Sequence, residues 1–313
     1  MKTTKRRMLP ALLIIMLLGT LLTGCAGKQS DAGQSDASQK EITCAADLEG
    51  ARIGVQLGTT GDIYVSDYEG DDAGTKIERY NKGADAIQAL KLGKIDCVVI
   101  DEQPGLQFVK QNSNIRIIDE EFTLEDYAFC VAKENTELLD NINGALEKLK
   151  ADGTIDSIVK NYIGTDDEVG QYPYVSKEVE RNNGTLIIGT NAEFPPYEYY
   201  DNNQVTGIDI DIMRAISDEL GMDIQVEDMA FDSIIAAITS GKVNVGASGF
   251  TVTEERKKNI NFTNTYITTK QVIIVKGDSD TQKASIGEKF YDNFIKDSRY
   301  MYIVKGLGNT LLI

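Results

Sequence analysis

The sequence predicts a two-lobed α/β protein. The chain has 313 residues, of which 42% are apolar and 26% are charged, and this composition allows a large buried core. Short β-rich runs alternate with helical patterns on both sides of a polar stretch near the middle of the chain. Because strands that alternate with helices form layered α/β sheets, we expect each side of that stretch to contribute to one lobe.

Composition excludes several classes of function. The chain contains no histidine, so Ser-His-Asp and Cys-His catalytic groups and histidine-based zinc sites are excluded. The formal net charge of -17 argues against nucleic acid as a partner, since a phosphate backbone requires a basic surface. We therefore expect no histidine-based metal site and no nucleic-acid partner, and we assign no catalytic residue, metal ion or cofactor.

The first residues have the order of a secretory signal. Basic residues in "MKTTKRR" precede an apolar run, which ends at Leu22-Thr23-Gly24-Cys25. These four residues resemble the bacterial lipobox, in which the cysteine is diacylated and becomes the mature N-terminus; the alternative is an ordinary signal peptide with a chance cysteine. We expect 1–24 to be a lipoprotein signal peptide, Cys25 to carry the lipid and 25–46, which is rich in Ser, Gly, Gln and Asp, to be a flexible tether outside the cytoplasm.

Three further cysteines remain after Cys25. Cys44, Cys97 and Cys130 are an odd number in an exported chain, and their spacing fits no metal site. At least one of them is expected to stay free.

Residues 47–126 are predicted to form the smaller lobe. β-rich runs and apolar periodicity indicate the following elements: strands at 51–56, 75–81, 97–101 and 115–119, and helices at 82–94 and 102–112. Residues 127–164 are expected to return to the larger lobe, as a hinge strand at 127–133 followed by helices within 136–163.

The larger lobe is predicted to be completed after a linker. Residues 165–184 are polar and low in aliphatic side chains, which is typical of a linker. The rest of the lobe, 185–277, is expected to contain strands at 185–190, 224–229, 243–248 and 271–276 and helices at 207–221 and 232–241.

Long motifs in both halves resemble the polar amino-acid solute-binding proteins of ABC transporters. The first half of that family is similar to "IIGTNAEFPPYEYYDNNQVTGIDIDIMRAISDELG", "MAFDSIIAAITSGKVNVGASGFTVTEERKKNINFTNTY" and "QVIIVK". The remainder is similar to "DLEGARIGVQLGTTGD", "ADAIQALKLGKIDCVVIDEQP" and "YAFCVAKENTELLDNINGALEKLKADGTIDSIVKNYIG", so the order is reversed. The resemblance implies a circularly permuted, type II periplasmic-binding-protein-like fold. It also implies that the protein delivers an amino acid to a membrane permease, and that its partners are this permease and, through the permease, a cytoplasmic ATPase.

A free amino acid is a zwitterion, so its capture requires a planar cation and a carboxylate. The resemblance assigns the ligand carboxylate to Arg256, with the Thr251 hydroxyl and the Gly249 backbone beside it, and the ligand ammonium to Asp101. The alternatives are that Arg256 caps or pairs on a surface helix and that Asp101 caps the helix that follows it.

The remaining candidate residues surround the ligand. The turn "GTTG" follows a strand and is expected to aim N–H groups at an anion, with Thr59 and Thr60 in the site, although a tight strand-to-helix turn needs the same residues. The resemblance implies that Phe194 and Phe231 sandwich the ligand, or else belong to the core. It also implies that Asn191, Glu193 and Gln56 select its side chain, and their departure from a glutamine-specific pattern favours a neutral polar or basic amino acid.

The C-terminal stretch 278–313 resembles the entry to a transporter permease. The stretch of about 13 residues from Met301 is largely apolar but includes Lys305, whereas a membrane span needs ~20. We expect a truncated pre-permease segment; the alternative is an amphipathic helix that lies on the lobe.

Two other functions remain open. Cyclohexadienyl dehydratases, which act on prephenate or arogenate, share this fold, but Glu193 is the only spare acid for such chemistry. A sensor or a remnant that no longer binds is the third hypothesis. The reversed order further predicts that one hinge strand joins the lobes where the family has two, or that two chains exchange halves.

Overall fold

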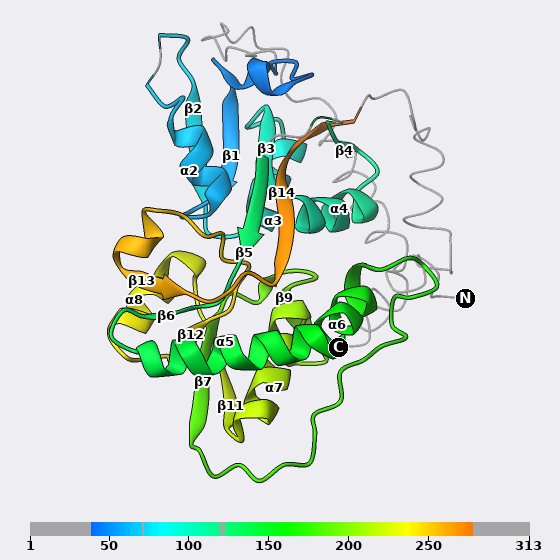
Figure 1. Ribbon diagram of the computed structural model, residues 1–313. Coiled ribbons are helices and arrows are strands. Elements are labelled where there is room, and N and C mark those ends of the chain that lie inside the picture. The colour runs from blue at the N-terminus through cyan, green and yellow to red at the C-terminus, as the bar shows by residue number, and fades with distance from the viewer. Residues whose placement is uncertain (1–38, 71, 119, 121–122, 278–313) are drawn as a thin grey trace, which may run out of the picture. The chain divides into compact units, whose positions relative to one another are not determined.

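The structure is a computed structural model that describes residues 39–70, 72–118, 120 and 123–277 (Figure 1). The predicted signal peptide, the predicted lipidation site Cys25 and the predicted pre-permease segment 278–313 lie outside the described residues. Within these residues, no helix has the length and apolar character that a membrane crossing requires.

The smaller lobe is built on a mixed sheet. Within the described residues its strand order is β2-β1-β3-β14-β4, and β5 also pairs with β14. Strands β1 to β3 are parallel, and β14 is antiparallel to its neighbours. The elements are η1 (Ala45–Leu48), β1 (Arg52–Gln56), α2 (Thr60–Ser66), β2 (Lys76–Tyr80), α3 (Gly83–Lys91), β3 (Cys97–Asp101), α4 (Glu102–Gln111), β4 (Ile115–Ile117), β5 (Thr123–Tyr127) and β14 (Ile267–Lys276).

The larger lobe contains a second mixed sheet, with the order β11-β7-β12-β6-β13 in the described part of the chain, and a small antiparallel sheet, β10-β9-β8. Helices α5 and α6 pack on α7. The elements are β6 (Cys130–Ala132), α5 (Thr136–Ala151), α6 (Thr154–Ile163), β7 (Thr185–Thr190), β8 (Glu193–Phe194), β9 (Glu198–Asp201), β10 (Gln204–Thr206), α7 (Ile208–Leu220), β11 (Asp223–Asp228), η2 (Phe231–Ser233), α8 (Ile234–Thr239), β12 (Val245–Gly246), η3 (Arg256–Lys258) and β13 (Ile260–Phe262).

Apolar periodicity explains these layers. On α5, four residues at the spacing of one helical face are buried: Ile142, Ala145, Leu146 and Leu149. Strand β3 is buried along its whole length because it lies inside the sheet between β1 and β14. The three cysteines of the described region, Cys44, Cys97 and Cys130, are all free thiols, which agrees with the prediction that at least one is unpaired.

The chain passes between the two sheets twice within the described residues. One crossing joins β5 to β6, and the other joins β13 to β14 (Figure 1). The expectation of a single hinge strand is therefore wrong, and so is the assignment of residues 267–276 to the larger lobe. The apolar segment of β14 pairs with β3, from Val272 opposite Ile100 to Val275 opposite Cys97. This pairing makes β14 a strand of the smaller lobe's sheet.

The predicted tether ends earlier than residue 46. Gln39 donates to the carbonyl oxygen of Ile95 at 2.7 Å, the Lys40 amide donates to Asp96 at 2.9 Å, and Ile42 is buried. Residues 39–46 are thus attached to the smaller lobe.

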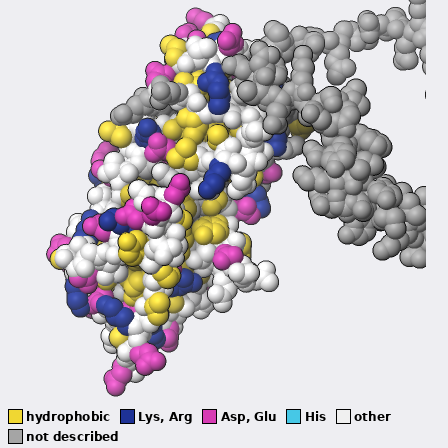
Figure 2. Space-filling model, turned by 90° about the vertical axis from the view of Figure 1, so that its right-hand side faces the viewer, with side chains coloured by type: hydrophobic (Ala, Val, Ile, Leu, Met, Phe, Trp, Pro, Cys, Tyr) yellow, Lys and Arg dark blue, Asp and Glu magenta, His cyan; other side chains and the backbone are white. Residues whose placement is uncertain are grey.

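On the face shown in Figure 2, acidic, basic and apolar side chains are interspersed.

The linker at 165–184 contains no helix or strand, as predicted, but it is fastened to α7. The Asp218 carboxylate accepts hydrogen bonds from the Tyr174 hydroxyl at 2.6 Å, the Ser176 hydroxyl at 3.0 Å and the Lys177 amide at 2.7 Å. It also pairs with Arg181. One buried carboxylate therefore holds eight consecutive residues of the linker, 174–181, against the larger lobe.

We predict that Asp218→Ala lowers the free energy of unfolding by about 3 kcal/mol, because it leaves several donors of a buried network without an acceptor. Thermal or urea unfolding measures this loss, and limited proteolysis should show new cleavage within 165–184. Glu178→Ala, an exposed change in the same linker, is the control and should stay within about 0.5 kcal/mol of the wild type. Equal stability of the two variants would contradict the assignment.

Candidate functional site

A pocket of about 250 Å³, open solvent at its mouth included, lies between residues of the two lobes. The smaller lobe supplies the first three of its lining residues and the larger lobe the other five: Gln56, Thr59, Asp101, Asn191, Phe194, Phe231, Ser248 and Gly249. All of these except Ser248 were predicted from the sequence. Four predicted residues, Arg256, Thr251, Thr60 and Glu193, lie around this lining rather than in it.

Asp101 lies at the carboxyl end of β3, with its side chain in the pocket wall. Its backbone occupies the cap position of α4, but its carboxylate makes no capping hydrogen bond. The Tyr127 hydroxyl donates to this carboxylate instead. Burial, followed by the charge of Glu125, raises the pKa of Asp101 to about 7, while the hydrogen bonds from Tyr127 and Gln271 favour the ionised form.

Arg256 is a buried cation of the larger lobe that lies next to the pocket lining. Its guanidinium donates to the carbonyl oxygens of Thr251 at 2.9 Å and of Gly58, across the lobes, at 3.0 Å. The guanidinium carbon is 5.6 Å from the ring centre of Phe231, which lines the pocket. None of the ion pairs of the described residues includes Arg256, and its burial lowers the pKa of the guanidinium. The alternative prediction, that Arg256 caps or pairs on a surface helix, is therefore wrong.

The predicted hydroxyl donors bond to a carboxylate of the chain itself. Thr251 donates to Glu125 Oε2 at 2.7 Å and Thr60 donates to the same oxygen at 3.0 Å. The two hydroxyl oxygens are 3.1 Å apart, although one belongs to each lobe. Glu125 is thus the common acceptor of a contact between the lobes.

Several backbone and hydroxyl donors expected to face an anion already have partners. The Gly58 amide donates to Asp62 at 2.9 Å, and the Thr59 hydroxyl donates to the carbonyl oxygen of Gln56 at 2.8 Å. The Gly249 amide donates to Asp209 at 2.9 Å. The amides of Gly58 and Gly249 therefore already donate to carboxylates of the chain, while Gly249 itself lies in the pocket lining.

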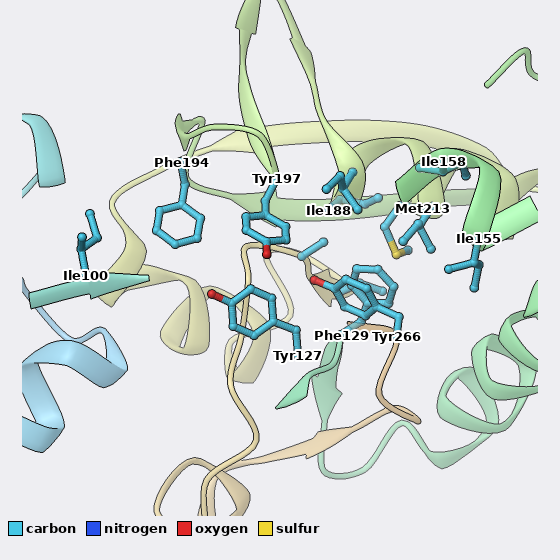
Figure 3. Close-up of a cluster of buried hydrophobic side chains, with 14 of the residues drawn as sticks. Ile100, Tyr127, Phe129, Ile155, Ile158, Ile188, Phe194, Tyr197, Met213 and Tyr266 are labelled. Atoms are coloured by element: carbon cyan, nitrogen blue, oxygen red, sulfur yellow. The ribbon is translucent and has the colours of Figure 1, made fainter. Parts of the chain in front are cut away.

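Gly249 is nevertheless required where it is. Its φ is +54°, and a Cβ atom there would lie 3.0 Å from ring carbons of both Phe194 and Tyr127. Phe194, Tyr197 and Tyr127 lie side by side in the close-up of Figure 3, with the Tyr127 and Tyr197 ring centres 5.2 Å apart. Phe194 and Phe231 line the pocket and also belong to buried clusters, so their core role is confirmed and their contact with a ligand stays a prediction.

The three predicted selectivity residues make contacts between the lobes. Gln56 donates from its side-chain amide to Asn191 Oδ1 at 2.9 Å, and both residues are buried. Glu193 pairs with Lys82 at 2.5 Å, and these two side chains are partly exposed. The amide pair lines the pocket, while the ion pair lies outside its lining.

Sequence reasoning missed the buried carboxylates that hold this site in place. Glu198 accepts from the Ser248 hydroxyl at 2.8 Å, and Asp209 accepts from the Tyr266 hydroxyl at 2.6 Å. Burial raises the pKa of both carboxyls, that of Asp209 to about 7. Asp209 lies on the inward face of a helix, where apolar residues are expected, and this exception to the pattern could have identified it. Glu125 lies in a strand that was not predicted. Three or more metal-ligating side chains do not cluster anywhere in the described part of the chain.

The bacterial extracellular solute-binding proteins, family 3, match this chain over residues 70–165 and 186–303. The chain belongs to this family. Among curated relatives, it is 39% identical over 97 residues to the arginine-binding extracellular protein ArtP of Bacillus subtilis, which covers 31% of this chain and 38% of the relative. It is 28% identical over 126 residues to the L-cystine-binding protein TcyJ of Escherichia coli, covering 40% and 46%.

Solved structures also show similarity over part of the family 3 chain. An ancestral arginine-binding protein bound to arginine is 48% identical over 24% of this chain and 34% of its own, with a TM-score of 0.24. The chain thus spans less than half the length of the curated relatives described above, 38% and 46%.

We predict that Tyr127→Phe raises the pKa of Asp101 by about one unit, because the ionised carboxylate loses a hydrogen-bond donor. Carbon-13 NMR of the labelled aspartate carboxyl groups measures the titration. Tyr266→Phe is the matched control, since its hydroxyl donates to Asp209 and should shift that group instead. An unchanged Asp101 titration in Tyr127→Phe would contradict the assigned contact.

Proposed function

We propose that this family 3 chain binds one free polar amino acid between its lobes outside the cytoplasm and delivers it to an ABC importer. The observation that carries the proposal is the placement of a buried cation, Arg256, and a buried carboxylate, Asp101, around one pocket lined by two aromatic rings. Such a pair matches the two charges of an α-amino acid.

The two charges come from different lobes. Asp101 ends a strand of the smaller lobe, whereas Arg256 follows the loop that leaves β12 in the larger lobe. A ligand that contacts both residues stabilises the arrangement in which the lobes touch, so binding and closure are coupled. The Asp101 carboxyl must be ionised to receive the ligand ammonium. Because its pKa is about 7, ligand binding should depend on pH around neutrality.

The residues that line the pocket and those beside it support a polar ligand, neutral or basic. The Gln56–Asn191 amide pair presents uncharged polar groups, and Glu193 adds a carboxylate that Lys82 neutralises. Relatives named for arginine and for L-cystine include both kinds of side chain. Because Lys82 already holds Glu193 at 2.5 Å, a basic ligand would have to compete with this lysine.

The alternatives are less well supported. A cyclohexadienyl dehydratase would need an acid aimed at the ligand, and the pairing of Glu193 with Lys82 leaves that carboxylate committed elsewhere. A remnant without binding activity would not be expected to retain a buried arginine next to a pocket, since an unused buried charge is costly. A binding protein accounts for both observations.

We further propose that the halves are circularly permuted within one chain. The linker 165–184 joins α6 to β7, and both elements belong to the larger lobe, where α6 packs on α7. Joining two ends on one lobe is the geometry that a permutation of this fold requires. The transporter partners in this proposal are a membrane permease and, through it, a cytoplasmic ATPase.

We predict that Arg256→Ala and Asp101→Ala each weaken amino-acid binding by about 2–5 kcal/mol, because each leaves a ligand charge desolvated without a partner. Arg256→Lys should also bind poorly, since an ammonium lacks the two-pronged donor geometry. Calorimetry with the amino acid that co-purifies with the chain measures the affinity and should give one ligand per monomer. Lys257→Ala, an exposed neighbour paired only locally with Glu254, is the control. Wild-type affinity in either Ala variant would refute its assigned role.

We predict that Cys25→Ser releases the protein from the membrane, since a lipid rather than a span is proposed to anchor it. Fractionation of cells that express each form, with acylation followed by mass spectrometry, measures the change. Cys44→Ser keeps Cys25 and should leave the protein in the membrane fraction. Equal membrane retention of Cys25→Ser would assign the anchor to another segment.

A further inference from the structure

Glu125 is a buried carboxylate beside the proposed ligand site. It lies on β5 opposite Thr269 of β14, with a relative exposure of 3%. Its Oε2 atom accepts three hydrogen bonds: from the Thr251 hydroxyl at 2.7 Å, the Thr60 hydroxyl at 3.0 Å and the Gln271 amide at 3.2 Å. The first two donors are residues that the sequence predicted for the ligand.

The same neighbourhood contains the cation proposed for the ligand carboxylate. Thr251 is the link, because its hydroxyl donates to Glu125 while its carbonyl oxygen accepts from Arg256 at 2.9 Å. Arg256 has no ion-pair partner within the described residues. Glu125 therefore supplies negative charge close to Arg256 without contacting it directly.

We propose that Glu125 is an internal carboxylate that competes with the carboxylate of the bound amino acid for the hydroxyls of Thr60 and Thr251 and for the charge of Arg256. The inference rests on the proposed function, and it adds a residue that sets the affinity for the ligand. Glu125 acts through these neighbours and is a positioning residue.

Two physical consequences follow. A ligand carboxylate that approaches Arg256 brings a second negative charge close to Glu125, and repulsion between them weakens binding in a site with little water. Without a ligand, the Glu125 contacts join Thr60 of the smaller lobe to Thr251 of the larger lobe. The residue therefore favours the touching arrangement of the lobes while it limits the affinity for the ligand carboxylate.

The test compares wild type with Glu125→Gln, which keeps the shape and removes the charge. Calorimetry uses two probe pairs, L-arginine with L-argininamide and L-glutamine with L-glutaminamide. Each amide keeps the ammonium and side chain but lacks the carboxylate. We expect Glu125→Gln to raise the ratio of acid to amide affinity about tenfold. A merely structural role would change both affinities together.

Asp126→Asn is the matched control. Asp126 is the next residue of β5, is exposed and bonds to Thr268, so its variant removes one charge without altering the site. Its acid-to-amide ratio should equal that of the wild type. If Glu125→Gln fails to fold, Glu125→Asp, whose shorter side chain releases the hydroxyls, should raise the ratio less but in the same direction.

The outcomes separate the two proposals. If the wild type binds one of the amino acids and the ratio in Glu125→Gln is unchanged or lower, the role of Glu125 is overturned and the proposed function stands. If the wild type binds none of the four probes and no co-purified amino acid, both are overturned. A raised ratio in Glu125→Gln with an unchanged ratio in Asp126→Asn supports the inference.

Discussion

Arg256 is buried with no carboxylate paired to it among the residues that the structure describes, and the site is arranged around this constraint. A buried guanidinium is costly unless acceptors surround it, and here two backbone carbonyl oxygens and the faces of Phe231 and Phe250 do so. The acceptor from Gly58 belongs to the other lobe, so the cation is satisfied only where the lobes meet. A ligand carboxylate would complete this environment, which is why the geometry favours an anionic group in the pocket.

Strands β5 and β14 connect that constraint to the fold. Their pairing places Glu125 opposite Thr269, and the pairing of β14 with β3 places Gln271 opposite Asp101. Both strands lead directly into the crossings between the sheets, so Glu125 lies on a crossing strand and Asp101 lies on β3, which pairs with the other. Movement of the lobes would therefore change the surroundings of Asp101 and Glu125 together.

Apolar periodicity is a local signal, and it predicted most helices and strands. Most of the pocket lining was predicted by the resemblance of long motifs to the family. The sequence could not predict partners distant along the chain. The Gly249 amide bonds to Asp209, 40 positions away along the chain, and β5, with only five residues and two of them buried, has a weak pattern. The second crossing was missed because the sequence of β14 fits a strand of either sheet. Only its pairing with β3 shows that it belongs to the sheet of the smaller lobe.

The most direct test of the account is a crystal structure of the full chain with the amino acid that co-purifies with it. The account predicts the ligand carboxylate within hydrogen-bonding distance of the Arg256 guanidinium and the ligand ammonium within hydrogen-bonding distance of Asp101, with Phe194 and Phe231 against the ligand. A ligand bound away from both charges, or one whose carboxylate and ammonium are held by other residues, would contradict it.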